Sequence, residues 1–127
     1  MSPVFDPREG LIIVHAEIVG PSGTAILRLA LDTGATTTLI NSGMLVSIGY
    51  DPALSSDRVQ TTGSGLEFVP RVVVKRLIAL GSEREEFPVL SHTLPPSAGV
   101  DGLLGLDFLR GHMLTLDLAQ GIMTLES

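Results

Sequence analysis

Short β-branched and apolar runs, repeatedly interrupted by glycine and proline, are the feature of this sequence that most limits its possible folds. The chain has 127 residues, of which 14 are glycine and 8 are proline. Its longest uninterrupted apolar stretches, such as Leu11–Val14, span only a few residues. This pattern favours an all-β domain, closed into a barrel or built as a sandwich, and it leaves no segment able to insert in a membrane.

The elements expected along the chain are mostly strands joined by tight turns. The run from Thr24 to Leu31 alternates in polarity, which predicts a strand with Leu27 and Leu29 on one face. Asn41 or Ser42 is expected to cap a short helix that Gly49 stops. The other expected elements are strands at Leu11–Val19, Thr36–Ile40, Val59–Thr62, Leu66–Leu80, Phe87–Leu90 and Gly102–Gly105, a solvated charged turn at Glu83–Glu86, a helical turn at Leu106–Arg110 and a hairpin from His112 to Leu125.

Composition excludes several classes of function. The length corresponds to a single domain, residues 1–127, and there are no cysteines to form disulfides or thiolate metal sites. The net charge is −6 and the basic residues do not cluster beyond Lys75-Arg76, so nucleic acid is not expected as a partner. His15, His92 and His112 show no metal-ligand spacing, and we expect neither a metal nor a cofactor.

The N-terminal residues do not resemble a targeting segment. Met1–Pro7 lacks both the basic start and the apolar middle of a signal peptide. A cytoplasmic location is therefore the default expectation.

Asp32-Thr33-Gly34-Ala35 is the motif with the clearest chemical meaning. It follows the apolar strand that ends at Leu31, and it occurs once. Such a tripeptide taken alone is often only an aspartate-led turn at the end of a strand. A carboxylate held there is also what acid–base catalysis requires.

Two further segments give that motif a context. Gly63-Ser64-Gly65 reads as the flexible tip of a hairpin, and Val100–Leu109 contains an apolar-apolar-glycine unit followed by a short helix. In order and spacing, the three segments resemble a retropepsin-like aspartic protease. The bacterial branch and the protease-like domain of the DNA-damage-inducible ubiquitin-shuttle proteins are the most similar. The resemblance covers the core from Leu11 to Leu125.

The resemblance implies a closed acid-protease barrel with one or two short helices and one lobe per chain. It also implies an aspartic endopeptidase that acts on peptide or protein substrates as a homodimer, with Asp32 of each copy as the catalytic carboxylate. Thr33 would bond across the two-fold axis, Gly34 would let the substrate backbone approach, and Ala35 would keep the neighbouring wall small. The remaining implied site residues are the supports Leu103, Leu104 and Gly105 and the flap residues Thr62, Gly63, Ser64 and Gly65.

Two positions depart from the retroviral members of that family. The acid that usually follows the Asp-Thr-Gly-Ala unit is Thr36 here, and the arginine after the second glycine is Leu106. Both charges are missing together, so the ion pair is replaced rather than left with one uncompensated partner. The terminal hairpin also differs, so the dimer contacts cannot be carried over residue by residue.

Other acids and other functions remain open at this stage. Asp101 is expected in a turn, and Asp107 is expected to cap the short helix or to accept from backbone N–H groups. The leading alternative function is a non-catalytic peptide-binding or dimerisation module on the same fold. A monomeric β-barrel with an unrelated role is the third possibility.

Overall fold

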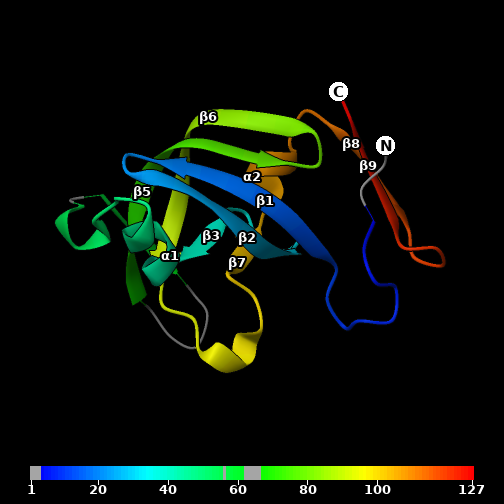
Figure 1. The fold of residues 1–127 in the computed structure, drawn as a ribbon, viewed down its shortest axis with the longest axis horizontal. Helices are drawn as coiled ribbons and strands as arrows, with labels where there is room; N and C mark the ends of the chain where they lie inside the picture. The colour runs from blue at the N-terminus through cyan, green and yellow to red at the C-terminus, as the bar shows by residue number, and fades with distance from the viewer. Residues whose placement is uncertain (1–3, 56, 62–66) are drawn as a thin grey trace.

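The structure is a computed structural model that describes residues 4–55, 57–61 and 67–127. Strands dominate it, as the sequence predicts (Figure 1). The strands are β1 (Ile13–Gly20), β2 (Gly23–Leu31), β3 (Leu39–Asn41), β4 (Arg58–Thr61), β5 (Glu67–Ala79), β6 (Ser82–His92), β7 (Gly102–Leu104), β8 (Met113–Asp117) and β9 (Ile122–Glu126). The helices are α1 (Ser42–Ser47) and α2 (Leu106–Leu109), with single 3₁₀ turns at Pro52–Leu54 and Pro96–Ala98.

The main sheet closes on itself. Its strands follow the order β1-β2-β7-β3-β6-β5-β4, and a further pairing of β1 with β5 joins the first six into a ring. β4 continues outward from β5, to which it pairs antiparallel. The predicted closed barrel with short helices is therefore confirmed.

The barrel interior is filled by alternate residues of its strands. In β2, Leu27 and Leu29 are fully buried, whereas Ile26, which precedes Leu27, is 64% exposed. Phe108 from α2 is also fully buried, and its ring meets that of Phe87 edge-on, with centroids 5.9 Å apart. α2 therefore closes the core from the C-terminal half of the chain.

The helix α1 begins and ends where the sequence predicts. The Asn41 side chain accepts a hydrogen bond from the Gly43 amide at its start. Gly49, directly after it, has a positive φ of 101°, a conformation that glycine adopts without strain. Local capping chemistry alone is enough to set these limits.

The hairpin β8–β9 forms a separate two-stranded sheet at one end of the molecule (Figure 1). Its inner side chains pack against the barrel core: Leu114, Leu116, Met123 and Leu125. The N-terminal segment lies along β9, where Val4 bridges Ile122 and the Phe5 amide donates to the Gly121 carbonyl at 2.8 Å. A two-stranded hairpin depends on such packing, because it is marginal in isolation.

Two predicted local elements are wrong. Glu83–Glu86 is not a turn but part of β6, which pairs with β5 from Arg71↔Leu90 to Ala79↔Ser82. The expected strand at Thr36–Ile40 is shorter, since pairing starts only at Leu39. The residues before Leu39 belong to a loop whose shape is set by contacts distant in sequence.

Candidate active site

Asp32 lies directly after β2, at the point where that strand meets β7. β2 and β7 are parallel, with Leu31 opposite Leu104, and the Asp32 amide extends the pairing by donating to the Leu104 carbonyl at 3.0 Å. The residue is half-buried. The pairing of β2 with β7 therefore fixes the backbone of Asp32.

The carboxylate of Asp32 is held by its own loop. The Gly34 amide donates to Oδ1 at 2.9 Å, and the Ala35 amide donates to the Asp32 carbonyl at 3.1 Å. Within the described ranges, Oδ2 accepts no hydrogen bond. The turn thus orients one carboxylate oxygen, whereas the other has no partner among the described residues.

Gly34 sits close to the same carboxylate. A Cβ built on it would lie 3.2 Å from Asp32 Oδ1, which is tighter than an ordinary van der Waals contact. A side chain at this position would therefore press on the oxygen that the Gly34 amide holds.

A buried clamp joins the Asp32 loop to α2. The Thr38 amide donates to both oxygens of Asp107 at 3.0 Å, and its hydroxyl donates to Oδ1 at 2.7 Å. The same hydroxyl accepts from the Gly105 amide at 3.1 Å. Thr38 is fully buried, so these bonds are shielded from water.

The expectation that Asp107 accepts from backbone N–H groups is confirmed, since the Phe108 amide also donates to its Oδ1 at 2.9 Å. Thr38 was missed, because its position in a run of threonines reads as strand. No local sequence signal links it to a carboxylate 69 residues away.

β7 lies beneath the loop, where the sequence places its supports. Leu104 is fully buried, Leu103 is half-buried, and the Leu106 amide donates to the Ala35 carbonyl at 2.8 Å. A Cβ on Gly105 would lie 2.9 Å from the Ala35 carbonyl oxygen.

Gly102 allows the closest strand contact in this region. A Cβ there would lie 2.0 Å from the Leu39 carbonyl oxygen, so only glycine fits between β7 and β3. This contact brings the two halves of the site together.

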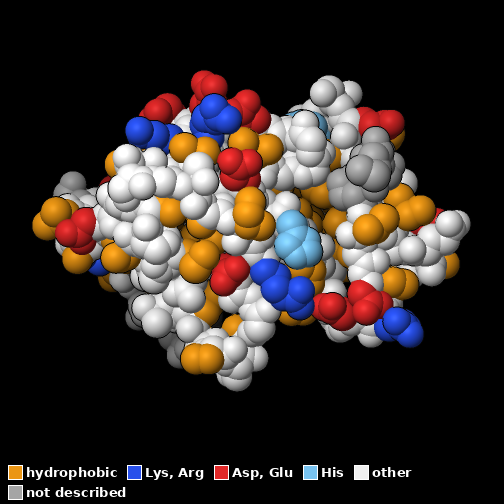
Figure 2. Space-filling view, in the orientation of Figure 1, with side chains coloured by type: hydrophobic (Ala, Val, Ile, Leu, Met, Phe, Trp, Pro, Cys, Tyr) orange, Lys and Arg blue, Asp and Glu red, His pale blue; other side chains and the backbone are white. Residues whose placement is uncertain are grey.

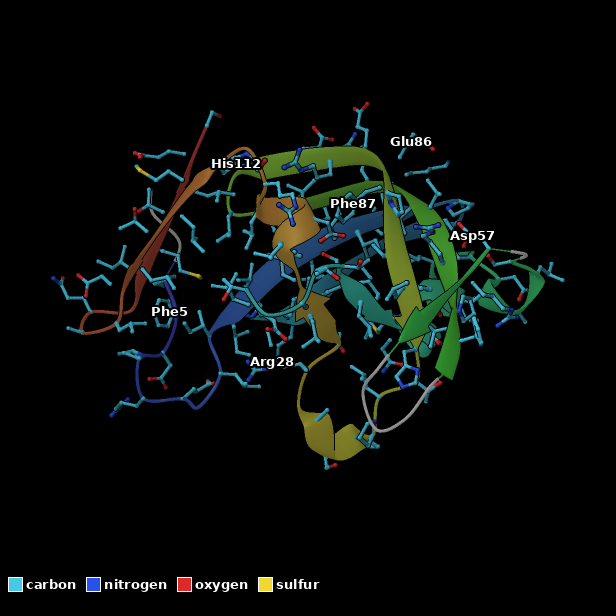
Figure 3. The ribbon with its side chains drawn as sticks, turned by 180° about the vertical axis from the view of Figure 1, so that it is seen from behind. Phe5, Arg28, Asp57, Glu86, Phe87 and His112 are labelled. Carbon is cyan, nitrogen blue, oxygen red and sulfur yellow. The ribbon has the colours of Figure 1, made fainter. Side chains whose placement is uncertain are left out.

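Thr33 is exposed and faces away from the clamp. It lines a cavity of about 220 Å³ together with Leu106, Leu109, Arg110, His112 and Leu114. Figure 3 shows His112 between α2 and the start of β8. The cavity therefore connects the predicted catalytic loop to the terminal hairpin.

Asp101 and Arg28, at the other end of β7, have structural partners. The Asp101 carboxylate accepts from the Arg28 amide at 2.8 Å, which agrees with its expected place in a turn. The Arg28 guanidinium donates to Gly99 and Glu9 (Figure 3). Among the described residues, no group of histidines and acids could hold a metal ion, and no helix is long and apolar enough to cross a membrane.

The predicted flap residues Thr62, Gly63, Ser64 and Gly65 lie outside the described residues. The strands on either side of them, β4 and β5, pair antiparallel from Arg58↔Pro70 to Thr61↔Glu67.

Comparison with known proteins decides the family. The family model described as aspartyl protease matches residues 14–108, which include Asp32, its loop and most of α2. The chain belongs to the aspartyl protease family. In this member of the aspartyl protease family, the match ends before the β8–β9 hairpin.

Solved structures support the retropepsin-like form of that fold. The chain is similar to a retropepsin-like aspartic protease from Rickettsia conorii, with a TM-score of 0.70 and 14% sequence identity. The similarity covers 100% of this chain and 92% of that one, and at this identity it shows the fold alone. No curated protein sequence matches the chain.

Proposed function

We propose that this member of the aspartyl protease family is an endopeptidase whose active form is a homodimer, with Asp32 of each copy facing the other across a two-fold axis. The observation that carries the proposal is the state of Asp32. Its backbone and one carboxylate oxygen are fixed, and the other oxygen accepts no bond among the described residues. The motif occurs once per chain, whereas the chemistry requires two carboxylates.

The mechanism follows from placing the two carboxyl groups about 3 Å apart, where they cannot both ionise and so share one proton. The ionised group takes a proton from a water molecule held between them. That water attacks the scissile carbonyl carbon, while the protonated group donates its proton to the carbonyl oxygen. As the tetrahedral intermediate collapses, the C–N bond breaks, the carboxyl group that took the proton of water donates it to the leaving amine, and the other carboxylate takes back a proton from a hydroxyl of the intermediate. Water is the nucleophile, so no covalent enzyme intermediate forms.

The other residues support this centre within one domain whose core is residues 11–125. Thr33 bonds to the partner loop, and Gly34 admits the substrate backbone beside a small Ala35 wall. Leu103, Leu104 and Gly105 hold the loop from below, a role favoured by the bond of Leu104 to Asp32, the close approach of Gly105 to Ala35 and the pairing of Leu103 between β2 and β3. Thr62–Gly65 closes over an extended peptide, which pairs as an added strand.

Cleavage of an unfolded protein by wild type and Asp32→Asn tests the reaction. Wild type should produce fragments with a bell-shaped dependence of rate on pH, because the pair titrates as a unit. Asp32→Asn should produce none and should still dimerise. Cleavage that survives in Asp32→Asn would show that another residue is catalytic. A wild-type dimer that binds peptide but cuts nothing at any pH would favour the non-catalytic module.

A further inference from the structure

The cavity beside Thr33 is open although its walls are apolar. Leu106, Leu109 and Leu114 are three of its six lining residues, and Thr33, Arg110 and His112 are the others. It lies between the Asp32 loop, the end of α2 and the first turn of β8. An apolar hollow of this size on the surface favours an occupant from outside the chain.

The position of Thr33 identifies that occupant as a second copy of this chain, an inference that rests on the proposed function. If two Asp32 carboxylates meet at the axis, Thr33 of each copy lies next to it. The cavity then falls within the interface, close to the axis. A two-fold interface uses the same surface of both copies. A segment of one copy that fills the partner's cavity is therefore matched by the same segment of the partner, which fills the cavity of the first copy.

The hairpin supplies a side chain that suits the cavity. Leu114 points to the core, so its neighbour Met113 points to the outer face of β8 and is 58% exposed. Figure 2 shows hydrophobic side chains gathered over the end of the molecule that the hairpin forms. Methionine is flexible and fills irregular apolar spaces well.

The charges around Met113 and the cavity are complementary. Glu126 pairs directly with Met113 across the hairpin, so both side chains lie on the outer face. Arg110 is exposed where it lines the cavity. Within the described part of the chain, neither charged group forms an ion pair.

The backbone around Arg110 is fixed while its side chain is free. Its carbonyl accepts from Arg84 Nη2 at 2.6 Å and lies 3.1 Å from His112 Nδ1. Arg84 also donates to the Phe108 carbonyl at 2.8 Å. The backbone of this cavity wall is therefore fixed before any partner binds, and the Arg110 guanidinium extends from it toward a carboxylate of the partner subunit.

We propose that in the dimer each Met113 enters the cavity of the other copy, and that each Glu126 forms an ion pair with Arg110 of the partner subunit. By symmetry the contact occurs twice. Met113, Glu126 and Arg110 all follow the residues matched by the family model, which end at 108.

Charge reversal tests the contact, with the dimer dissociation constant measured by sedimentation. Arg110→Glu and Glu126→Arg should each raise that constant by roughly tenfold or more, because two attractive contacts become repulsive. The double variant should return to within about twofold of wild type. Met113→Lys should also weaken the dimer. Lys75→Glu, at an exposed cation on β5, is the matched control and should leave it unchanged.

The outcomes separate this inference from the proposed function. A wild type that dimerises and cleaves, with no rescue in the double variant, would overturn the contact and leave the catalytic proposal intact. A cavity variant that alters the KM for peptide but not dimerisation would make the cavity a substrate subsite and also overturn it. Rescue of dimerisation without any cleavage would support the contact and refute the catalysis. A strictly monomeric wild type would refute both.

Discussion

Replacing Thr38 with valine should weaken the link between the Asp32 loop and α2 while keeping the shape of the side chain, because the hydroxyl is lost and the backbone amide of residue 38 is kept. The hydroxyl donates to Asp107 at 2.7 Å and accepts from the Gly105 amide at 3.1 Å. A hydrogen bond to a charged group contributes about 1.5–3 kcal/mol, and a buried amide left without a partner costs about 1–3 kcal/mol. Gly105 is buried. We therefore expect Thr38→Val to lower the free energy of unfolding by about 4 kcal/mol.

Urea denaturation at several protein concentrations measures this loss, because the stability of a dimer depends on concentration. Thr24→Val, at an exposed position on β2, is the matched control and should change the free energy by no more than about 0.5 kcal/mol. Asp107→Asn removes the negative charge from the group to which the Thr38 hydroxyl donates. The double variant should show a coupling energy of about 1 kcal/mol or more, since both changes break one network.

Catalysis should be affected through position. A displacement of Asp32 by about 1 Å would reduce the rate about 100-fold. The reasoning is refuted if Thr38→Val unfolds within about 0.5 kcal/mol of wild type, or if the coupling energy with Asp107→Asn is zero.

Four other predictions concern residues of the barrel and of the segments that pack on it. Gly102→Ala should abolish folding or lower the free energy of unfolding, measured by urea denaturation, by more than about 3 kcal/mol, because the new Cβ would collide with the Leu39 carbonyl oxygen. Gly23→Ala is the control and should fold normally, because nothing lies within 4 Å of a Cβ at that position. Tyr50 bonds to the Val19 carbonyl and the Lys75 amide, so Tyr50→Phe should lower the free energy of unfolding by about 1–3 kcal/mol. Burial raises the pKa of Tyr50, so an absorbance titration of this single tyrosine should have its midpoint above that of free tyrosine, and unfolding the chain should remove the difference. The Arg71 guanidinium lowers the pKa of the Asp57 carboxyl. Wild type should therefore be more stable than Arg71→Gln above the ordinary pKa of aspartate, and this difference in stability should vanish as pH falls through the lowered pKa of Asp57. A difference in urea midpoint that stays constant across that pH range would contradict this prediction.

The sequence predicts the features that depend on local chemistry. The alternation in Thr24–Leu31 places Leu27 and Leu29 inside, and Asn41 and Gly49 set the limits of α1. The succession of short strands predicts an all-β domain, and the resemblance carried by motifs that each lie within a few residues predicts the closed barrel and the family.

Features that depend on distant partners could not be predicted. Glu83–Glu86 reads as a charged turn because its three glutamates are exposed on the outside of a long strand, although its backbone pairs with β5. Thr38 reads as strand because its partner Asp107 is remote in sequence. The cavity beside Thr33 combines residues of three separate segments, so no local pattern contains it.

The pairing of Asp32 with Leu104 has a consequence for the order of events during synthesis. A growing chain carries Asp32 early, yet the strand that pairs with it, β7, and the helix that is joined to its loop, α2, are made about 70 residues later. Contacts of such separation form slowly, because a long loop must close first. The Asp32 loop therefore cannot take its final shape until the chain has been translated through α2, however early its own residues appear.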